Sequence, residues 1–215
     1  MGCKRLGNFL AAQGYSGRTG PDVLLDRLRS AAPCQIGKAE ARVKGELVTA
    51  LTRVLITLTT QLTVLQQRIE HYLLTLPDGQ LLLSFPRIGR LNAAQILSEL
   101  GSVRERFQSE AQLAAEAGAS PVTRQSGKSR GVSFRWACNH RLRAAITMWA
   151  HNSRRACPWA QGIYQRARAR GARHPHAIRI LARAWVRVLW RVWHDRVPYD
   201  PFKHRGAMQL STTTV

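Results

Sequence analysis

Acidic residues are absent from a long stretch of this 215-residue chain. No Asp or Glu occurs between Ala117 and His194, a run of 78 residues that carries sixteen Lys and Arg. Unbalanced positive charge repels itself and destabilises a compact state, so this density indicates a partner that neutralises it. Nucleic acid is the favoured polyanion, because all but one of these cations are Arg, which binds phosphate through paired hydrogen bonds.

The rest of the chain is closer to balance. Residues 1–116 hold 14 basic and 10 acidic side chains, although the whole chain has a net charge of +21. A membrane surface is the competing partner, since polybasic segments also bind anionic lipid. The sequence has no clean amphipathic anchor, and Leu6 stands where a myristoylation signal needs Ser or Thr. We therefore expect no membrane partner.

Long apolar runs and paired cysteines are also missing. No apolar run approaches the roughly 20 residues that span a bilayer, and the N-terminus lacks an apolar stretch with a cleavage site. The four cysteines show no spacing typical of a zinc site or a redox motif, and no ligand lies close in sequence to the pair His174 and His176. We expect a cytoplasmic protein that binds no metal or cofactor with this chain.

Hydrophobic periodicity predicts an all-α fold. Apolar residues recur every three or four positions from Leu47 to Leu76, a heptad seam with one stutter. No segment alternates with a period of two, and residues 119–133 break the helical pattern and predict a loop. The expected parts are a remnant or linker with a short helix over 1–36, a long coiled-coil helix over 37–76, a compact multi-helix domain over 77–202 and a polar tail over 203–215.

The heptad seam indicates that the long helix packs against a partner helix. Self-association of several copies of the chain is the favoured interpretation. An intramolecular hairpin with another helix of the same chain is the alternative.

Residues Leu83 to Leu97 look like a helix-hairpin-helix element that binds the DNA backbone. In such an element a Gly-hydrophobic-Gly turn points backbone N–H groups at a phosphate. Here the turn reads Arg87-Ile88-Gly89-Arg90, so an arginine replaces the first glycine and adds a cation. An ordinary helical hairpin is the alternative, and the basic tract favours DNA binding.

The last helix has a cationic face and an apolar face. Its apolar residues are Ile178, Ala182, Trp185, Leu189, Val192 and Trp193. Its arginines recur every four residues, at Arg179, Arg183, Arg187 and Arg191. Like charges at this spacing repel each other, so an anionic partner would relieve a cost. Trp136 beside Arg135 either stacks on a base or fills the core, and core packing is favoured for the tryptophans in general.

The segment whose residues most suggest catalytic chemistry is the predicted loop around Ser126. This serine stands beside the flexible Gly127, and Arg124, Lys128 and Arg130 surround it. A serine hydroxyl in this setting can approach a phosphodiester while the cations stabilise charge on the phosphoryl group. The alternative is that the serine only turns the chain, because no nearby His, Asp or Glu in the sequence can take its proton.

Short motifs occur in a fixed order over residues 80–202. They are Phe85-Pro86-Arg87-Ile88-Gly89, Ala93-Ala94, Arg106-Phe107, Leu113-Ala114, Gly118, Pro121, Arg124-Gln125-Ser126-Gly127, Asn139, Arg141-Leu142-Arg143 and Pro198-Tyr199-Asp200-Pro201. In this order they resemble the C-terminal part of the bacterial insertion-sequence one-ten family of transposases. The long helix resembles the coiled coil that precedes that part.

The resemblance implies a DNA recombinase that joins donor and target DNA through a serine-linked intermediate, directed by a guide RNA. Ser126 takes the position of the nucleophilic serine, and Arg141 and Arg143 join the expected DNA contacts. The family's N-terminal RuvC-like domain supplies four acidic metal ligands, so Mg²⁺ is expected only with that domain. DNA, guide RNA and further copies of the chain are the expected partners, in a bacterial cytoplasm and close to the nucleoid.

Nothing before Gly37 resembles a RuvC-like fold. We therefore expect a truncated chain that is inactive by itself. The alternative function is a non-catalytic module that binds nucleic acid or joins protomers, and a structural RNA-binding protein is a third reading.

Overall fold

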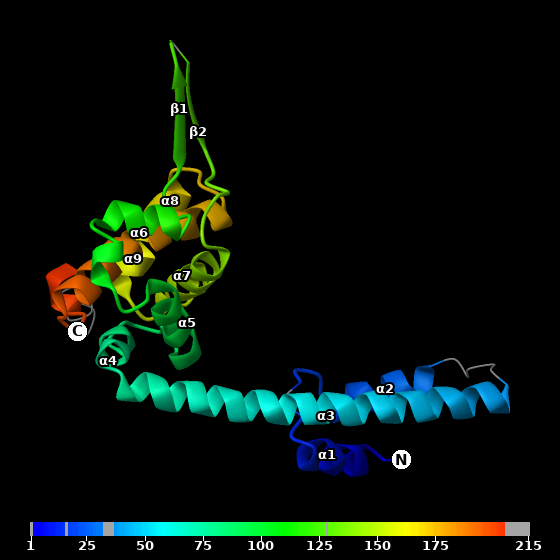
Figure 1. Ribbon diagram of the computed structural model, residues 1–215. Coiled ribbons are helices and arrows are strands. Elements are labelled where there is room, and N and C mark those ends of the chain that lie inside the picture. Colours follow the sequence, from blue (N-terminus) through cyan, green and yellow to red (C-terminus); the bar gives the residue numbers. More distant parts are fainter. Residues whose placement is uncertain (1, 16, 32–36, 128, 205–215) are drawn as a thin grey trace, which may run out of the picture. The chain divides into compact units, whose positions relative to one another are not determined.

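The computed structural model describes residues 2–15, 17–31, 37–127 and 129–204 (Figure 1). The chain divides into two compact units, Met1–Leu58 and Thr59–Val215. The boundary between them falls within the long helix α3 (Lys38–Thr75).

The first unit contains two short helices that contact each other. They are α1 (Cys3–Ala12) and α2 (Pro21–Ser30), and each buries one leucine, Leu6 or Leu25. Pro21 begins α2, where its missing N–H does no harm because the first N–H groups of a helix have no partner within it. The sequence predicts only the second of these helices.

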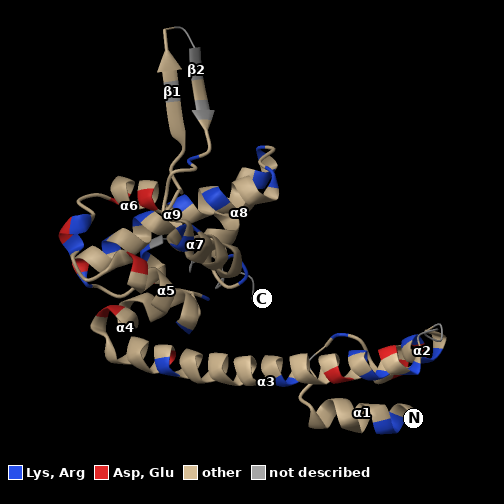
Figure 2. Ribbon diagram, turned by 45° about the vertical axis from the view of Figure 1, so that its right-hand side comes forward, with Lys and Arg blue, Asp and Glu red and all other residues tan. Residues whose placement is uncertain are grey.

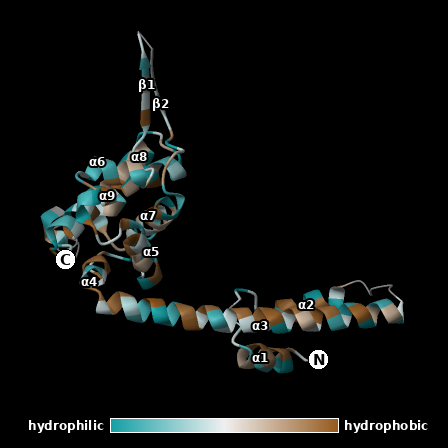
Figure 3. Cartoon of the chain, viewed as in Figure 1, coloured by the Kyte–Doolittle hydropathy of each residue, from teal (hydrophilic) through white to brown (hydrophobic). Residues whose placement is uncertain are grey.

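The helix α3 is continuous over 38 residues, as the heptad seam predicts. At 1.5 Å per residue it extends about 57 Å. The seam residues from Leu47 to Ile69 are each 45% to 57% exposed, and Figure 3 shows the hydrophobic positions along the helix. The Thr49, Thr52 and Thr57 hydroxyls donate to carbonyls four residues back at 2.7 to 3.0 Å, so these side chains are satisfied within the helix.

Length and composition alone would allow α3 to cross a membrane, a property that no other helix in the described parts of the chain shares. One such helix is weak evidence, because a heptad seam accounts for the same apolar residues. The helix α3 is therefore exposed without being a clear membrane span.

The second unit is a helical domain. Its helices are α4 (Pro77–Leu83), α5 (Arg90–Leu100), α6 (Glu110–Glu116), α7 (His140–Ser153), α8 (Pro158–Ala169) and α9 (His174–Asp195), with 3-10 turns at Arg104–Arg106 and Pro201–His204. Ser109 caps α6 by accepting the N–H of Gln112 at 3.3 Å. Asn139 caps α7 by accepting two N–H groups at 3.0 Å. These caps satisfy N–H groups that a first helical turn leaves unpaired.

The core of this domain is built around α9, which packs against α4, α6, α7 and α8. All six residues of its predicted apolar face are buried. The Trp185 Nε1 donates to Ser153 Oγ at 2.8 Å, which satisfies two buried polar groups at once. The rings of Trp149 and Phe85 lie 4.6 and 5.9 Å from the Trp185 ring. Core packing is thus confirmed for Trp149, Trp185 and Trp193.

Motifs from the two ends of the domain meet on this core. The backbone N–H of Tyr199 donates to Ser84 Oγ at 2.8 Å, and the Tyr199 ring lies 5.1 Å from that of Phe85. Trp149 Nε1 donates to the carbonyl of Pro86 at 3.1 Å. Burial raises the pKa of the Tyr199 hydroxyl, and the nearby Cys157 raises it further. Tyr199 therefore serves packing as a neutral phenol.

The described part of the second unit is all-α, as predicted, except that residues 122–126 and 129–133 form a hairpin where the sequence predicts a loop. The antiparallel strands are β1 (Val122–Ser126) and β2 (Ser129–Ser133), and the last pair joins Ser126 to Ser129. The hairpin projects from the helices in Figures 1 and 2. Its strands pair only with each other, so the sequence shows no alternation between a core face and a solvent face.

Gly118 ends α6 at a place where a side chain would not fit. Its φ of +61° lies in the left-handed region, and an added Cβ would meet Arg143 Nε at 2.6 Å and Cys138 Sγ at 2.9 Å. Glycine is needed here for both the backbone conformation and the space.

We expect Gly118→Ala to lower the free energy of unfolding by about 1–3 kcal/mol, from the positive φ and the displaced Arg143 side chain. Urea unfolding of the full chain measures the change. Gly162→Ala is the matched control. It lies within α8 next to a flexible arginine end and should raise the stability by about 0.5–1 kcal/mol. Equal effects of the two substitutions would contradict the role of Gly118.

Candidate nucleic-acid interface

Ser126 lies at the end of β1, in the pair of residues nearest the tip of the hairpin. It is exposed, and Gly127 follows it with a φ of +52°, which suits a tight hairpin turn. The hydroxyl is therefore reachable by a large ligand from outside the helical domain.

Three cations around Ser126 are predicted to clamp a phosphate. Lys128 lies outside the described residues, and only the backbone of Arg124 and Arg130 is described. The strand register pairs Arg124 with Gly131 and Gln125 with Arg130, within two positions of Ser126. The backbone thus keeps both arginines in the half of the hairpin that carries the serine.

Ser126 has no proton acceptor of the usual kinds on its own hairpin. Residues 119–137 contain no Asp, Glu, His or Cys. In the described parts of the chain, no three of these residue types lie close enough together to hold a metal ion. The hairpin therefore offers the Ser126 hydroxyl in a cationic setting, without a carboxylate beside it in the sequence.

The turn between α4 and α5 has the backbone shape of a glycine-rich turn. Arg87 has a φ of +55° and Gly89 a φ of +74°, so the arginine takes a conformation that glycine adopts more easily. Arg87, Gly89 and Arg90 are exposed, whereas Ile88 is only 3% exposed. The side chain of Ile88, predicted as a DNA contact, is instead a core anchor that fixes the turn.

Arg90 stands at the first position of α5, next to backbone N–H groups that no side chain caps. Its Nη1 lies 3.1 Å from Glu70 Oε2. Because both side chains are partly exposed, this pair contributes little to stability and leaves the guanidinium available to a phosphate.

The arginine row on α9 has a counter-charge within the chain, supplied by α6. Arg187 Nε lies 2.9 Å from Glu110 Oε2, and Arg183 Nη2 lies 3.6 Å from Glu110 Oε1. Arg183 also donates to the Glu110 carbonyl at 3.2 Å. An external anion is therefore not required to relieve repulsion between these two arginines. Arg191 is exposed at the end of the row, and Figure 2 shows Lys and Arg along α8 and α9.

Two more of the predicted DNA contacts hold an aromatic ring instead. The guanidinium of Arg143 lies 4.6 Å from the centre of the Phe134 ring, and that of Arg179 lies 5.0 Å from it. Arg143 also donates to the carbonyls of Arg135 and Trp136, at 2.6 and 3.2 Å. Both arginines thus position the segment after β2, whereas Arg141 is exposed at the start of α7.

A cluster of histidine, tyrosine and arginine joins α7, α8 and α9. Tyr164 Oη lies 2.8 Å from His174 Nδ1, and Arg154 Nη2 lies 3.3 Å from His151 Nε2. Partial burial lowers the pKa of His151, and the adjacent Arg154 and His174 lower it further. The sequence does not reveal this cluster, because its members are dispersed over three helices. His174 is exposed at the start of α9 and contacts Tyr164 and the ring of His151 in this cluster.

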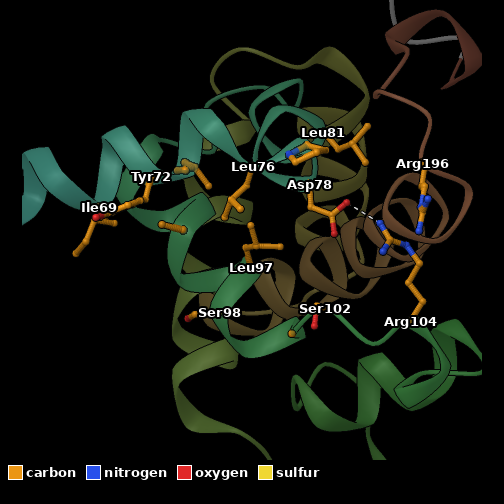
Figure 4. A pocket seen from close by; sticks show the side chains of 14 residues that line it. Ile69, Tyr72, Leu76, Asp78, Leu81, Leu97, Ser98, Ser102, Arg104 and Arg196 are labelled. Carbon is orange, nitrogen blue, oxygen red and sulfur yellow. Dashed lines mark hydrogen bonds and ion pairs between the residues drawn. The ribbon is translucent and has the colours of Figure 1, made fainter.

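An apolar pocket of about 750 Å³ is lined mainly by the end of α3, by α4 and by the second half of α5 (Figure 4). Leu73, Leu76 and Leu97 line it, and at one end Arg104 Nη2 contacts Asp78 Oδ1 at 2.6 Å. No residue of the hairpin lines this pocket, so it is separate from Ser126. Ile69 and Tyr72 make it continuous with the apolar seam of α3.

Comparison with known proteins agrees with the order of the motifs. Residues 79–165 match the family described as Transposase IS116/IS110/IS902. The chain is 37% identical over 123 residues to the mini-circle putative transposase for IS117 of Streptomyces coelicolor, covering 57% of this chain and 30% of that protein. It is 31% identical over 161 residues to the uncharacterized 42 kDa protein of insertion element IS900 of Mycobacterium paratuberculosis, covering 74% of this chain and 40% of that protein.

A third relative, the uncharacterized 44.8 kDa protein of insertion element IS116 of Streptomyces clavuligerus, is 26% identical over 201 residues. That alignment covers 93% of this chain and 50% of the relative, so the chain spans at most about half the length of these proteins. The matched region runs from within α4 to within α8 and includes the hairpin with Ser126. Residues 79–165 are therefore similar to the IS116/IS110/IS902 family of transposases, which agrees with the resemblance that the sequence motifs carry.

Proposed function

We propose that this chain is the DNA-binding part of a transposase and that Ser126 is its nucleophile for DNA strand transfer. The observation that carries the proposal is the place of Ser126, exposed near the tip of a hairpin in a stretch without acidic residues. The family of residues 79–165 supports the reaction class.

The hairpin suits a hydroxyl that must reach a DNA backbone. Four steps of about 3.4 Å separate the Ser126 pair from the Val122 pair at its base, so the serine extends about 14 Å along the strands. A phosphodiester that reaches the tip meets no carboxylate on the hairpin, which would repel it. Arg124 of β1 and Arg130 of β2 belong to the same hairpin and would stabilise charge on the phosphoryl group.

In the proposed reaction, Ser126 Oγ attacks the phosphorus of a phosphodiester. The Oγ–P bond forms, the bond from phosphorus to one deoxyribose oxygen breaks, and that oxygen leaves as a DNA hydroxyl after taking up a proton. The serine proton passes to a base outside residues 119–137. A hydroxyl of another DNA strand then attacks the same phosphorus, and Oγ leaves with a proton to restore Ser126.

We propose that the turn before α5 contacts the DNA backbone at a phosphate other than the one that reacts. Arg87 and Arg90 are exposed beside the uncapped N–H groups of α5, and a helix N-terminus favours an anion. Arg191 and the exposed Arg187 extend the cationic surface along α9. A guide RNA would use the same kind of contact, since phosphates dominate binding to both nucleic acids.

The exposed seam of α3 supports a second part of the proposal, that copies of this chain associate through this helix. Seven apolar side chains at heptad spacing remain about half exposed. Burying such a seam against a second helix is the usual outcome of this pattern.

We expect Ser126→Ala to abolish a covalent protein–DNA adduct. The full chain is incubated with nicked DNA, alone and with a RuvC-like domain of the family added, and adducts are separated by denaturing electrophoresis. Ser133→Ala is the matched control in β2, at the base of the hairpin, and should keep the adduct. An adduct that survives Ser126→Ala would contradict the assignment. Salt-sensitive DNA binding without any adduct would leave the non-catalytic binding module as the function.

We expect Leu62→Glu with Leu65→Glu to weaken self-association at least about 100-fold, because each carboxylate would enter the buried seam. Sedimentation equilibrium of the full chain measures the dissociation constant. Gln61→Glu with Gln66→Glu adds the same charge to α3 outside the seam and should change it only a few-fold. A wild-type chain that stays monomeric at high concentration would contradict association through α3.

A further inference from the structure

Trp136 differs from the buried tryptophans of the second unit. It is 74% exposed, whereas Trp149, Trp185 and Trp193 are fully buried. The core role favoured for tryptophans by sequence is therefore wrong for Trp136. An exposed indole leaves much apolar surface in water, so this position suggests a ligand that covers the ring.

The Trp136 ring stands on a built support. Its centre lies 4.9 Å from that of Phe134, edge to face at 82°. Phe134 in turn contacts the guanidinium groups of Arg143 and Arg179, which come from α7 and α9. Arg143 also donates to the Trp136 carbonyl at 3.2 Å. The backbone and the neighbouring ring are thus tied to two helices of the core, which lowers the entropic cost of stacking a ligand on the indole.

The surroundings of this aromatic support are cationic. A groove of about 480 Å³ beside it is lined by Phe134, Arg135, His176, Arg179 and Arg183, and no carboxylate lines it. A second groove of about 640 Å³ shares Phe134 and Arg179 and also has no carboxylate in its lining. An exposed indole packed on Phe134, which lines both grooves, is complementary to a flat aromatic ring that carries phosphates.

An unpaired nucleobase has these properties, whereas a base within a duplex already stacks on both neighbours. Aromatic side chains stack on unpaired bases with little regard to sequence, and arginines bind the adjoining phosphates. DNA is the source that fits the position. Trp136 lies three residues beyond Ser133, at the base of the hairpin whose tip carries Ser126. The roughly 14 Å length of the hairpin corresponds to about four nucleotides of a duplex strand at 3.4 Å each.

We infer that Trp136 is a stacking platform for an unpaired DNA base a few nucleotides from the phosphate at Ser126, held in place by Phe134, Arg143 and Arg179. This inference rests on the DNA binding proposed above and is independent of whether Ser126 reacts. The platform would favour DNA that is opened next to the strand break over intact duplex.

The test compares two fluorescein-labelled DNAs with the same number of phosphates, a blunt duplex and a duplex that is three base pairs shorter and carries a six-nucleotide single-stranded tail. Fluorescence anisotropy at one salt concentration gives the dissociation constants of the full chain. Trp136→Ala should weaken binding of the tailed DNA roughly tenfold to hundredfold, the loss of one stacked base. It should change binding of the blunt duplex less than twofold, because no charge is removed. Trp136→Phe should restore most of the affinity.

Phe202→Ala is the matched control, since Phe202 is also an exposed aromatic residue at 75% and lies outside the hairpin region. It should change neither constant. Equal affinity of wild type and Trp136→Ala for the tailed DNA, with DNA binding intact, would overturn the platform alone. A wild-type chain that binds neither DNA would overturn the DNA-binding proposal itself. A loss seen only when the tail is RNA would overturn the assignment to DNA.

Discussion

The fold of the second unit must accommodate many positive charges in a stretch that has no acidic residues. Sixteen cations from Ala117 to His194 would repel one another in a small domain. The fold relieves part of this cost with groups outside the stretch or without charge. Glu110 of α6 pairs with Arg183 and Arg187, and the Phe134 ring contacts two further guanidiniums. The remaining exposed arginines can contact an anionic ligand.

The sequence predicted the elements that bury a regular face or begin at a cap. The heptads of α3, the Asn139 cap and the apolar face of α9 are local patterns that the structure confirms. The hairpin was predicted as a loop because neither strand faces the core, so no alternation of apolar residues marks it. The Glu110 partner of the α9 arginines was not predictable, because more than 70 residues separate the two elements.

The candidate site was predicted in part. The sequence indicates a serine in a cationic segment, and the structure gives it an exposed position near a hairpin tip, while its role stays a prediction. Among the other predicted contacts, Ile88 belongs to the core and Arg143 supports the backbone at Trp136. The exposure of Trp136 could not be read from sequence, because the same residue type fills the core at Trp185. Only the packing around each ring distinguishes the two.

The arginines of the second unit fall into two groups, although each adds the same charge. Arg143 and Arg179 lie against Phe134, so they help to fix where the aromatic rings lie. Arg87, Arg90 and Arg191 are exposed and remain suited to phosphate. Phosphate contacts set affinity and its dependence on salt, whereas stacking depends on an unpaired base. Under the proposed function, a surface with both would hold DNA of any sequence and would still prefer a strand that is open near Ser126.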